Sequence, residues 1–303
     1  MTSHIQTLRA LLRDEKGVLL PGAPNALTAR IVEDLGFKAV YLTGAGLTNT
    51  DLGLPDLGFM DLSQVAGHVL AIRGVVELPL IVDIDTGFGN ALNVAHTIRT
   101  LEQAGASAVQ LEDQRAPKRC GHFEGKALIS AEEMAGKVRA AADARRQDMV
   151  IIARTDACAV EGFEAAIDRA GRYIEAGADM TFVEAPRTLE DLNAIPRLLP
   201  APQMLNMVLG GKTPIVDAAA AGEMGFGLVL YANAALQAAI HAGDAEGAQG
   251  DGGARRADGH LVRRAATAGG PGHVRRDGGE LRRRRADPRI GALDFRFTRA
   301  RNP

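Results

Sequence analysis

Residues 112–122 bring two carboxylates, a lysine, a thiol and an imidazole together in one short segment. The segment starts where the apolar run 107–111 ends, and such a run is typical of a buried strand. Asp83 and Asp85 end the preceding apolar run in the same way. Carboxylates at the ends of buried strands are costly to desolvate unless a metal or another cation holds them, so both clusters indicate a functional site.

The carboxylates of Asp83, Asp85 and Glu112 are hard oxygen ligands of the kind that suits Mg2+. Asp83 and Asp85 stand two positions apart, so at an extended strand end they point to the same side. Strand-end caps or salt bridges are the simpler interpretation for any single carboxylate. Three of them at consecutive strand ends favour a metal site, with Mg2+ as the expected ion and Mn2+ as the alternative.

Cys120 lies in the basic, glycine-containing segment 118–122. A lone cysteine is often only a small residue packed in a loop. Cationic neighbours such as Lys118 lower the pKa of a thiol, however, so we expect Cys120 to be available for proton transfer or nucleophilic attack. His122 orients Cys120 or a substrate carboxylate in one interpretation, and hydrogen-bonds within its own loop in the other. Cys158 lacks such neighbours, and we expect it to be structural.

Further polar side chains end the later apolar runs. The planar guanidinium of Arg154 suits a substrate carboxylate, or a salt bridge to Glu112 or Glu184, or both at once. Asn206 ends the run after that of Glu184. The small-residue turn 43–46 follows an earlier run, and its backbone N–H groups can approach an anion.

Apolar strand-like runs alternate with helix-like stretches along most of the chain. The predicted strands are 18–20, 39–42, 80–82, 108–111, 149–153, 180–183, 203–206 and 226–231. The predicted helices are 26–35, 62–76, 92–104, 131–145, 163–176, 189–195 and 214–221. Eight repeats of a strand-helix unit predict the α/β class and a closed parallel (β/α)8 barrel of the TIM type, in preference to a doubly wound sheet. The polar clusters follow the strands, which places them at the C-terminal face, where the active sites of this fold lie.

The composition changes near Ala248. We predict a catalytic barrel domain over 1–247, followed by a tail over 248–303 that is rich in Arg, Gly and Ala. The tail has few large apolar residues and no helical periodicity, so it is predicted to be mostly disordered. The abrupt change and the lack of any repeat favour an altered reading frame over a native basic tail.

The whole chain has 303 residues, of which 46% are hydrophobic and 24% charged, and its formal net charge is −2. This balance gives no argument for a nucleic-acid or membrane partner, and the arginines of the tail add only a weak one. No apolar run is long enough to span a bilayer, the N-terminus does not resemble a signal peptide, and two cysteines make no disulfide framework. We expect a cytoplasmic protein.

Together these motifs resemble the isocitrate lyase/phosphoenolpyruvate mutase superfamily. Residues 118–122 resemble its signature, and the supporting motifs stand in order at 54–56, 83–89, 111–114, 153–157 and 206–208. The resemblance covers about residues 18 to 240 and is strongest to the 2-methylisocitrate lyases and the 2,3-dimethylmalate lyase-like proteins. It does not extend over the tail.

The resemblance implies a Mg2+-dependent enzyme that acts on 2-hydroxy or 2-keto carboxylates and forms a homotetramer or a dimer. Asp83 and Asp85, with Glu112 through water, would hold the metal. The implied substrate-binding residues are Thr43, Gly44, Ala45, Asp56, Gly121, Arg154, Glu184 and Asn206.

In the lyases of the superfamily, cleavage is a retro-aldol step. Tyr41 is a candidate for the base that removes the proton of the 2-hydroxyl group, and Cys120 would protonate the leaving aci-carboxylate as a general acid. Lys118 and His122 complete the implied catalytic set. Mutases that rearrange P–C bonds generally lack this cysteine, so its presence favours cleavage of a carbon–carbon bond.

The substrate is less closely defined. Gln237 stands where methylisocitrate lyases carry an arginine for a third carboxylate, and 206–214 is more similar to the dimethylmalate-type group. Both features favour a dicarboxylate over a tricarboxylate. The alternatives are a carboxyvinyl-carboxyphosphonate phosphorylmutase or phosphoenolpyruvate mutase-like enzyme, an oxaloacetate decarboxylase or hydrolase, and an inactive barrel that only binds ligands.

Overall fold

The computed structural model describes residues 3–119, 125–208 and 211–249. Eight parallel strands close into a barrel in the order β1 to β8, and β8 pairs back to β1. The strands are β1 (Val18–Ala23), β2 (Val40–Leu42), β3 (Leu80–Asp83), β4 (Ala108–Glu112), β5 (Val150–Thr155), β6 (Met180–Val183), β7 (Gln203–Asn206) and β8 (Leu228–Tyr231). The closed sheet confirms the predicted (β/α)8 barrel and excludes the doubly wound alternative.

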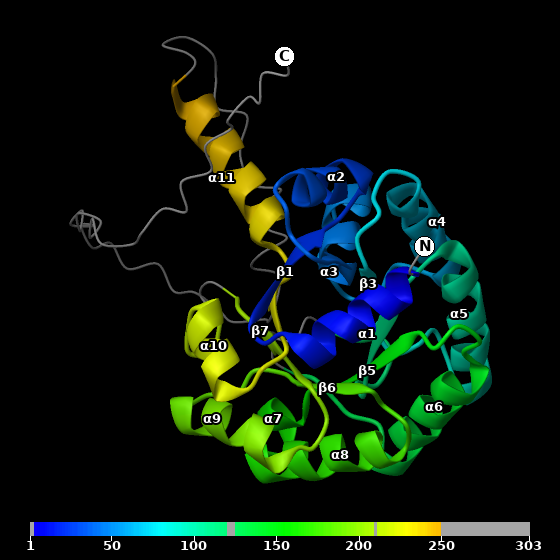
Figure 1. Cartoon of the computed structure of the whole chain (residues 1–303). Coiled ribbons are helices and arrows are strands. Elements are labelled where there is room, and N and C mark those ends of the chain that lie inside the picture. The colour runs from blue at the N-terminus through cyan, green and yellow to red at the C-terminus, as the bar shows by residue number, and fades with distance from the viewer. Residues whose placement is uncertain (1–2, 120–124, 209–210, 250–303) are drawn as a thin grey trace, which may run out of the picture. The chain divides into compact units, whose positions relative to one another are not determined.

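Longer helices connect successive strands and lie around the outside of the barrel (Figure 1). They are α2 (Ala26–Asp34), α4 (Leu62–Arg73), α5 (Ala91–Ala104), α6 (Ala131–Ala144), α8 (Phe163–Glu175), α9 (Leu189–Leu198) and α10 (Ala218–Met224). Local sequence sets their ends, as in α5. Asn90 accepts from the backbone of Leu92 and Asn93 in a capping box, and Gly105 ends the helix at a φ of 101°, which suits glycine.

Side chains of the strands alternate between one apolar cluster inside the barrel and two clusters between the sheet and the helices. Leu20, Tyr41 and Phe182 belong to the cluster inside the barrel, whereas Leu42 and Val82 pack between the sheet and the helices. The inward positions of the strands become polar toward their C-terminal ends. The polar inward positions are Asp83, Gln110, Glu112, Arg154, Glu184 and Asn206. The alternation of the strands therefore carries the predicted site residues to the mouth of the barrel.

The opposite, N-terminal end of the barrel is closed by α1 (His4–Asp14), which lies across it in Figure 1. Ser3 and Gln6 form a capping box at the start of this helix. Leu8, Leu11 and Leu12 are buried and join the apolar cluster inside the barrel. This helix is absent from the predicted elements, and it supplies the bottom layer of the barrel core.

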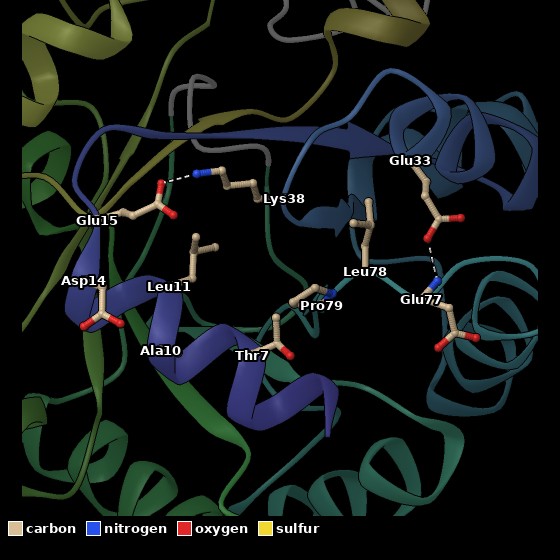
Figure 2. Close-up of a pocket in the computed structure, with 10 residues that line it drawn as sticks. All are labelled: Thr7, Ala10, Leu11, Asp14, Glu15, Glu33, Lys38, Glu77, Leu78 and Pro79. Atoms are coloured by element: carbon tan, nitrogen blue, oxygen red, sulfur yellow. Dashed lines mark hydrogen bonds and ion pairs between the residues drawn. The ribbon is translucent and has the colours of Figure 1, made fainter. Parts of the chain in front are cut away.

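A pocket of about 460 Å3 lies beside α1 at this N-terminal end (Figure 2). Its wall includes Leu11 of α1, Leu78 ahead of β3, and Glu15, whose carboxylate pairs with Lys38. The pocket is therefore separate from the polar strand ends, and its wall carries none of the predicted site residues.

Four further elements were not predicted. The short helices α3 (Gly44–Leu47) and α7 (Ala157–Val160) and the π-helix η1 (Thr48–Leu52) follow β2 and β5 directly. Helix α11 (Ala234–Gln249) follows β8, and none of its side chains is buried as far as 242, the last position whose exposure the structure describes. No helix in the described part of the chain is long and apolar enough to cross a membrane.

The predicted tail falls almost wholly outside the described residues, which end at 249. The boundary at Ala248 and the disorder expected beyond it stay predictions.

Candidate active site

Asp83 and Asp85 stand at the C-terminal end of β3, where Gly44 lies directly against them. The Gly44 N–H donates to Asp83 Oδ2 at 3.3 Å, and the Asp85 N–H donates to Asp83 Oδ1 at 3.1 Å. A Cβ atom at position 44 would lie 3.1 Å from Asp83 Oδ2 and 3.3 Å from Asp85 Oδ1. Glycine therefore lets the backbone after β2 form one wall of the acidic cluster.

Lys118 is buried beside these carboxylates. Its Nζ lies 2.6 Å from Asp56 Oδ1 and 2.8 Å from Asp85 Oδ1. Burial opposes the charge on the ammonium, but the neighbouring carboxylates of Asp85 and Asp56 dominate and raise the Lys118 pKa well above its usual value. The structure thus brings together three predicted site residues from three separate segments of the chain.

A second group forms around Arg154 at the end of β5. Its Nε lies 2.9 Å from Asp156 Oδ2 and 3.2 Å from Glu112 Oε2, and its Nη2 lies 3.3 Å from Glu184 Oε2. The guanidinium carbon also stands 5.2 Å from the ring centroid of Phe182. The alternative role predicted for Arg154, a salt bridge to Glu112 or Glu184, is confirmed with both partners.

The carboxylates of the site hold more negative charge than their neighbours neutralise. Burial raises the pKa of Asp85 to about 6 and raises that of Glu112 well above its usual range. Within the described residues, Glu112 Oε1 is buried without a hydrogen-bond partner. Buried carboxylate oxygen without a donor is the environment into which a cation fits.

The donor set fits a hard divalent ion that keeps part of its water shell. No three His, Cys, Asp or Glu side chains of the described segments stand close enough to hold a metal by themselves. Magnesium usually binds through one or two carboxylates and completes its coordination with water and substrate oxygens. Asp83 and Asp85 match that requirement, and Glu112 lies close enough for its charge to interact with that of Asp85.

Tyr41 lies beneath the charged groups, in the barrel interior. Its hydroxyl donates to Gln110 Oε1 at 2.6 Å. Burial, together with the charge of Asp83, raises the Tyr41 pKa well above its usual value. Gln110 was not predicted as part of the site, although a polar residue at an inward position of the apolar run 107–111 was a usable signal.

The remaining predicted substrate contacts surround the mouth of the barrel. Thr43 caps α3 and donates to Asn233 Oδ1 at 3.2 Å, so the ends of β2 and β8 are joined. Ala45 is half-buried on the same short helix. The Asn206 side chain is nearly buried at the end of β7, and among the described residues its Oδ1 has no hydrogen-bond partner.

Cys120, Gly121 and His122 fall outside the described residues, and their predicted roles stay predictions. The chain on either side of them reaches the site. Lys118 does so before the gap, and Lys126 after it, where its Nζ lies 2.7 Å from Asp156 Oδ1. Burial opposes ionisation of Asp156, yet Arg154 and Lys126 lower its pKa to about 2. Nothing in the sequence around Lys126 separated it from a surface lysine.

Comparison with known proteins agrees with the superfamily resemblance that the motifs carry. Residues 8–249 match the family described as phosphoenolpyruvate phosphomutase. A 2-methylisocitrate lyase of Aeropyrum pernix is 47% identical over 237 residues, which cover 78% of this chain and 76% of that protein. A 2,3-dimethylmalate lyase of Eubacterium barkeri is 42% identical over 236 residues, which cover 78% of this chain and 82% of the relative.

Solved structures are similar over most of the chain. A crystal structure of 2,3-dimethylmalate lyase has a TM-score of 0.79 and 34% identity, and the match covers 88% of this chain and 93% of that one. Oxaloacetate acetylhydrolase with 3,3-difluorooxalacetate also has a TM-score of 0.79 and 34% identity, with 88% and 94% coverage. Phosphonopyruvate hydrolase in complex with oxalate and Mg2+ has a TM-score of 0.73 and 33% identity, with 88% and 95% coverage.

Proposed function

The chain belongs to the phosphoenolpyruvate phosphomutase family, and its similarity to named lyases of that family identifies it as a carbon–carbon lyase. We propose that it cleaves a 2-hydroxy dicarboxylate with the help of Mg2+. The products would be a 2-keto acid and a carboxylate. One observation carries the proposal most directly. Buried acidic groups in need of a cation stand beside Arg154, a buried cation suited to a substrate carboxylate.

Substrate binding is assigned to groups that face the mouth of the barrel. Arg154 already holds its guanidinium between three carboxylates, so a substrate carboxylate would meet an oriented cation. The Asn206 side chain and the backbone N–H groups after Thr43 would orient the other oxygens. Lys118 would keep Asp56 and Asp85 in place.

Asp83 and Asp85, with Glu112 through water, would hold Mg2+, which when bound would supply Lewis-acid stabilisation of developing negative charge. Tyr41 is the proposed base, and its first requirement is transfer of its own proton. In the ligand-free enzyme Tyr41 keeps this proton and donates it in a hydrogen bond to Gln110 Oε1. The proton would pass to water when Mg2+ is bound, because a nearby positive charge favours the phenolate. Cys120 would then protonate the leaving carboxylate as the general acid.

The decisive experiment is an assay of keto-acid release from a panel of 2-hydroxy di- and tricarboxylates, with and without Mg2+. Cys120→Ser tests the acid, and Cys158→Ser is a matched control because these are the two cysteines of the chain. We expect release that needs Mg2+ and Cys120 and is unaffected by Cys158→Ser. Absence of release from every substrate, with metal present, would refute the proposal.

The same panel separates substrate sizes and the second candidate. Gln237 is half-buried on α11, and we propose that without an arginine there the enzyme prefers dicarboxylates. Gln237→Arg would then shift the preference toward a tricarboxylate. Oxaloacetate is included because oxaloacetate acetylhydrolase matches this fold as closely as 2,3-dimethylmalate lyase does. Oxalate formation without cleavage of any 2-hydroxy acid would favour that hydrolase.

We also propose that the enzyme works in the cytoplasm as a homotetramer or a dimer. Light scattering of the purified chain at several concentrations measures the mass of the assembly. A monomer at all concentrations would contradict this part of the proposal.

A further inference from the structure

Asp113 is a buried carboxylate that the proposed reaction does not use. It follows Glu112 at the end of β4, and because side chains alternate, it points out of the barrel while Glu112 points in. Its exposed fraction is 0%. A carboxylate buried so completely on the outer side of a sheet needs donors, and the helix that covers it supplies two of them.

Four donors converge on Asp113. Its Oδ2 accepts from the Thr155 hydroxyl at 2.7 Å, from the Tyr173 hydroxyl at 2.7 Å and from Arg169 Nη1 at 3.4 Å. Its Oδ1 accepts from the backbone N–H of Asp156 at 3.0 Å. Tyr173 and Arg169 belong to α8, so this outer helix and the strand end of β5 are both fixed to one carboxylate.

The bond to the Asp156 N–H connects this outer network to the mouth of the barrel. Asp156 is the first residue after β5, and its own side chain turns toward the site. There it accepts from Arg154 Nε at 2.9 Å and from Arg154 Nη2 at 3.1 Å, a bidentate pair that fixes the plane of the guanidinium. The backbone orientation of Asp156 is therefore one of the constraints on where Arg154 points, beside the ion pairs of Arg154 with Glu112 and Glu184.

Arg169 gives the network a rigid outer anchor. It forms a two-bond pair with Glu161, with both distances at 2.7 Å, and it donates to the carbonyl of Ile129 at 3.0 Å. The Ile129 N–H in turn donates to the carbonyl of Asp113 at 3.0 Å. Asp113 is thus fixed through both its side chain and its backbone.

We propose that Asp113, braced by Tyr173 and Arg169, is a positioning residue that sets the orientation of Arg154 through Asp156. The inference rests on the proposed role of Arg154 in binding a substrate carboxylate. Asp113 touches neither substrate nor metal in this assignment. Its effect is transmitted through one backbone hydrogen bond and one bidentate ion pair.

The first test addresses the link from Asp113 to Asp156 and needs no ligand. Asp113→Asn keeps the size of the side chain but brings an amide N–H2 group among the donors. Hydrogen exchange of the amide at position 156 should accelerate in this variant, while exchange in α5 stays unchanged. Unchanged exchange at position 156 in a folded Asp113→Asn protein would overturn the proposal. Tyr173→Phe removes a single donor to Asp113. It replaces Asp113→Asn in the same hydrogen-exchange measurement if that variant fails to fold.

The second test is a double-mutant cycle with Arg154→Lys, measured as oxalate binding to the Mn2+-loaded protein by calorimetry. Asp113→Asn should weaken oxalate binding by roughly tenfold in the wild-type background and by less than about twofold beside Arg154→Lys. Asp168→Asn is the matched control, because Asp168 pairs with Arg172 at 2.9 Å on the exposed side of the same helix. It should leave oxalate affinity unchanged.

The outcomes separate this inference from the proposed function. An equal loss in both backgrounds, or no loss in either, would overturn the positioning role even if the enzyme proves to be a lyase. A coupled loss of oxalate affinity in a protein that cleaves no substrate would support the positioning role and refute the lyase. A wild-type protein that binds no oxalate with Mn2+ would overturn the carboxylate-binding role of Arg154 on which this inference rests, whereas the lyase would still be judged by keto-acid release.

Discussion

The two ends of the barrel differ in how fully their carboxylates are paired with hydrogen-bond donors and cations. At the C-terminal end, Glu112 is buried with a raised pKa, and its Oε1 has no hydrogen-bond partner among the described residues. At the N-terminal end, Asp179 accepts from Arg145, from Arg9 at 3.1 Å and from the backbone of Ile151 at 2.9 Å. Charge is left incompletely neutralised at one end and paired at the other.

The difference follows from what each end must do. Leucines of α1 fill the N-terminal opening, so that end can be packed and stabilised without constraint from a ligand. The C-terminal end must stay open to a ligand and keep groups ready to bind it, which costs stability in its absence. Substitutions should therefore reduce stability at one end and binding at the other.

Leu8→Ala should have the largest effect, and it should act on stability alone. Leu8 is fully buried in the cluster that closes the barrel, so truncation should lower the free energy of unfolding by about 3 kcal/mol. Activity per folded molecule should stay unchanged. Urea denaturation and the lyase assay measure the two quantities, and Leu27→Ala is the control because Leu27 is 72% exposed on α2. A large fall in kcat of the folded protein would contradict the expectation that substitutions at the N-terminal end reduce stability alone.

Glu112→Gln should show the opposite pattern. A neutral isostere removes the burial penalty of the carboxylate, so the metal-free variant should unfold at a temperature equal to or above that of wild type. Because Glu112 is proposed to hold the metal through water, the substitution should weaken Mg2+ affinity by roughly 10- to 100-fold. Calorimetry and thermal melts with and without Mg2+ measure both, beside Glu175→Gln on the exposed side of α8. Unchanged Mg2+ affinity would remove Glu112 from the site.

The sequence was informative wherever a local pattern decides the structure. The apolar runs located all eight strands, and Asp83, Glu112, Arg154 and Glu184 were expected at a shared mouth because they end successive runs. Helix α1 was missed because a helix ahead of the first strand is not part of the repeating unit. Its capping box at Ser3 was the available signal.

Contacts that depend on the closed barrel were beyond prediction. The pairing of Lys126 with Asp156 joins residues 30 positions apart, with α6 and β5 between them, and no pattern in the chain marks it. The outward role of Asp113 depends on which helix covers the end of β4, which only the packing of α8 decides. Long-range pairing of polar groups is set by tertiary geometry, whereas strand ends are set by local composition.

Asp179→Asn sharpens the comparison at the N-terminal end with a polar change. Two arginines and a backbone N–H lose a charged acceptor, so the free energy of unfolding should fall by roughly 1.5 kcal/mol, while KM and kcat stay unchanged. Asp34→Asn is the control, because its pair with Arg30 is exposed and should contribute little. A change in KM that corresponds to a larger free energy than the loss of unfolding free energy would show that the two ends are coupled.

The pH dependence of stability due to Cys158 shows whether this thiol, which also lies at the C-terminal end of the barrel, is a structural group or a reactive one. It lies on α7 just after β5, and burial raises its pKa from 9.0 to about 12. The unfolded chain then loses the thiol proton near pH 9 while the folded chain keeps it, so stability should fall as pH rises from about 9 to 12. Cys158→Ala removes this dependence, so the wild-type stability should decline more steeply than that of the variant across this window. Urea midpoints measured at intervals of pH compare the two slopes, which share all other titrations. Parallel slopes would mean that the folded thiol ionises readily, and Cys158 would then join the candidates for chemistry at this end of the barrel.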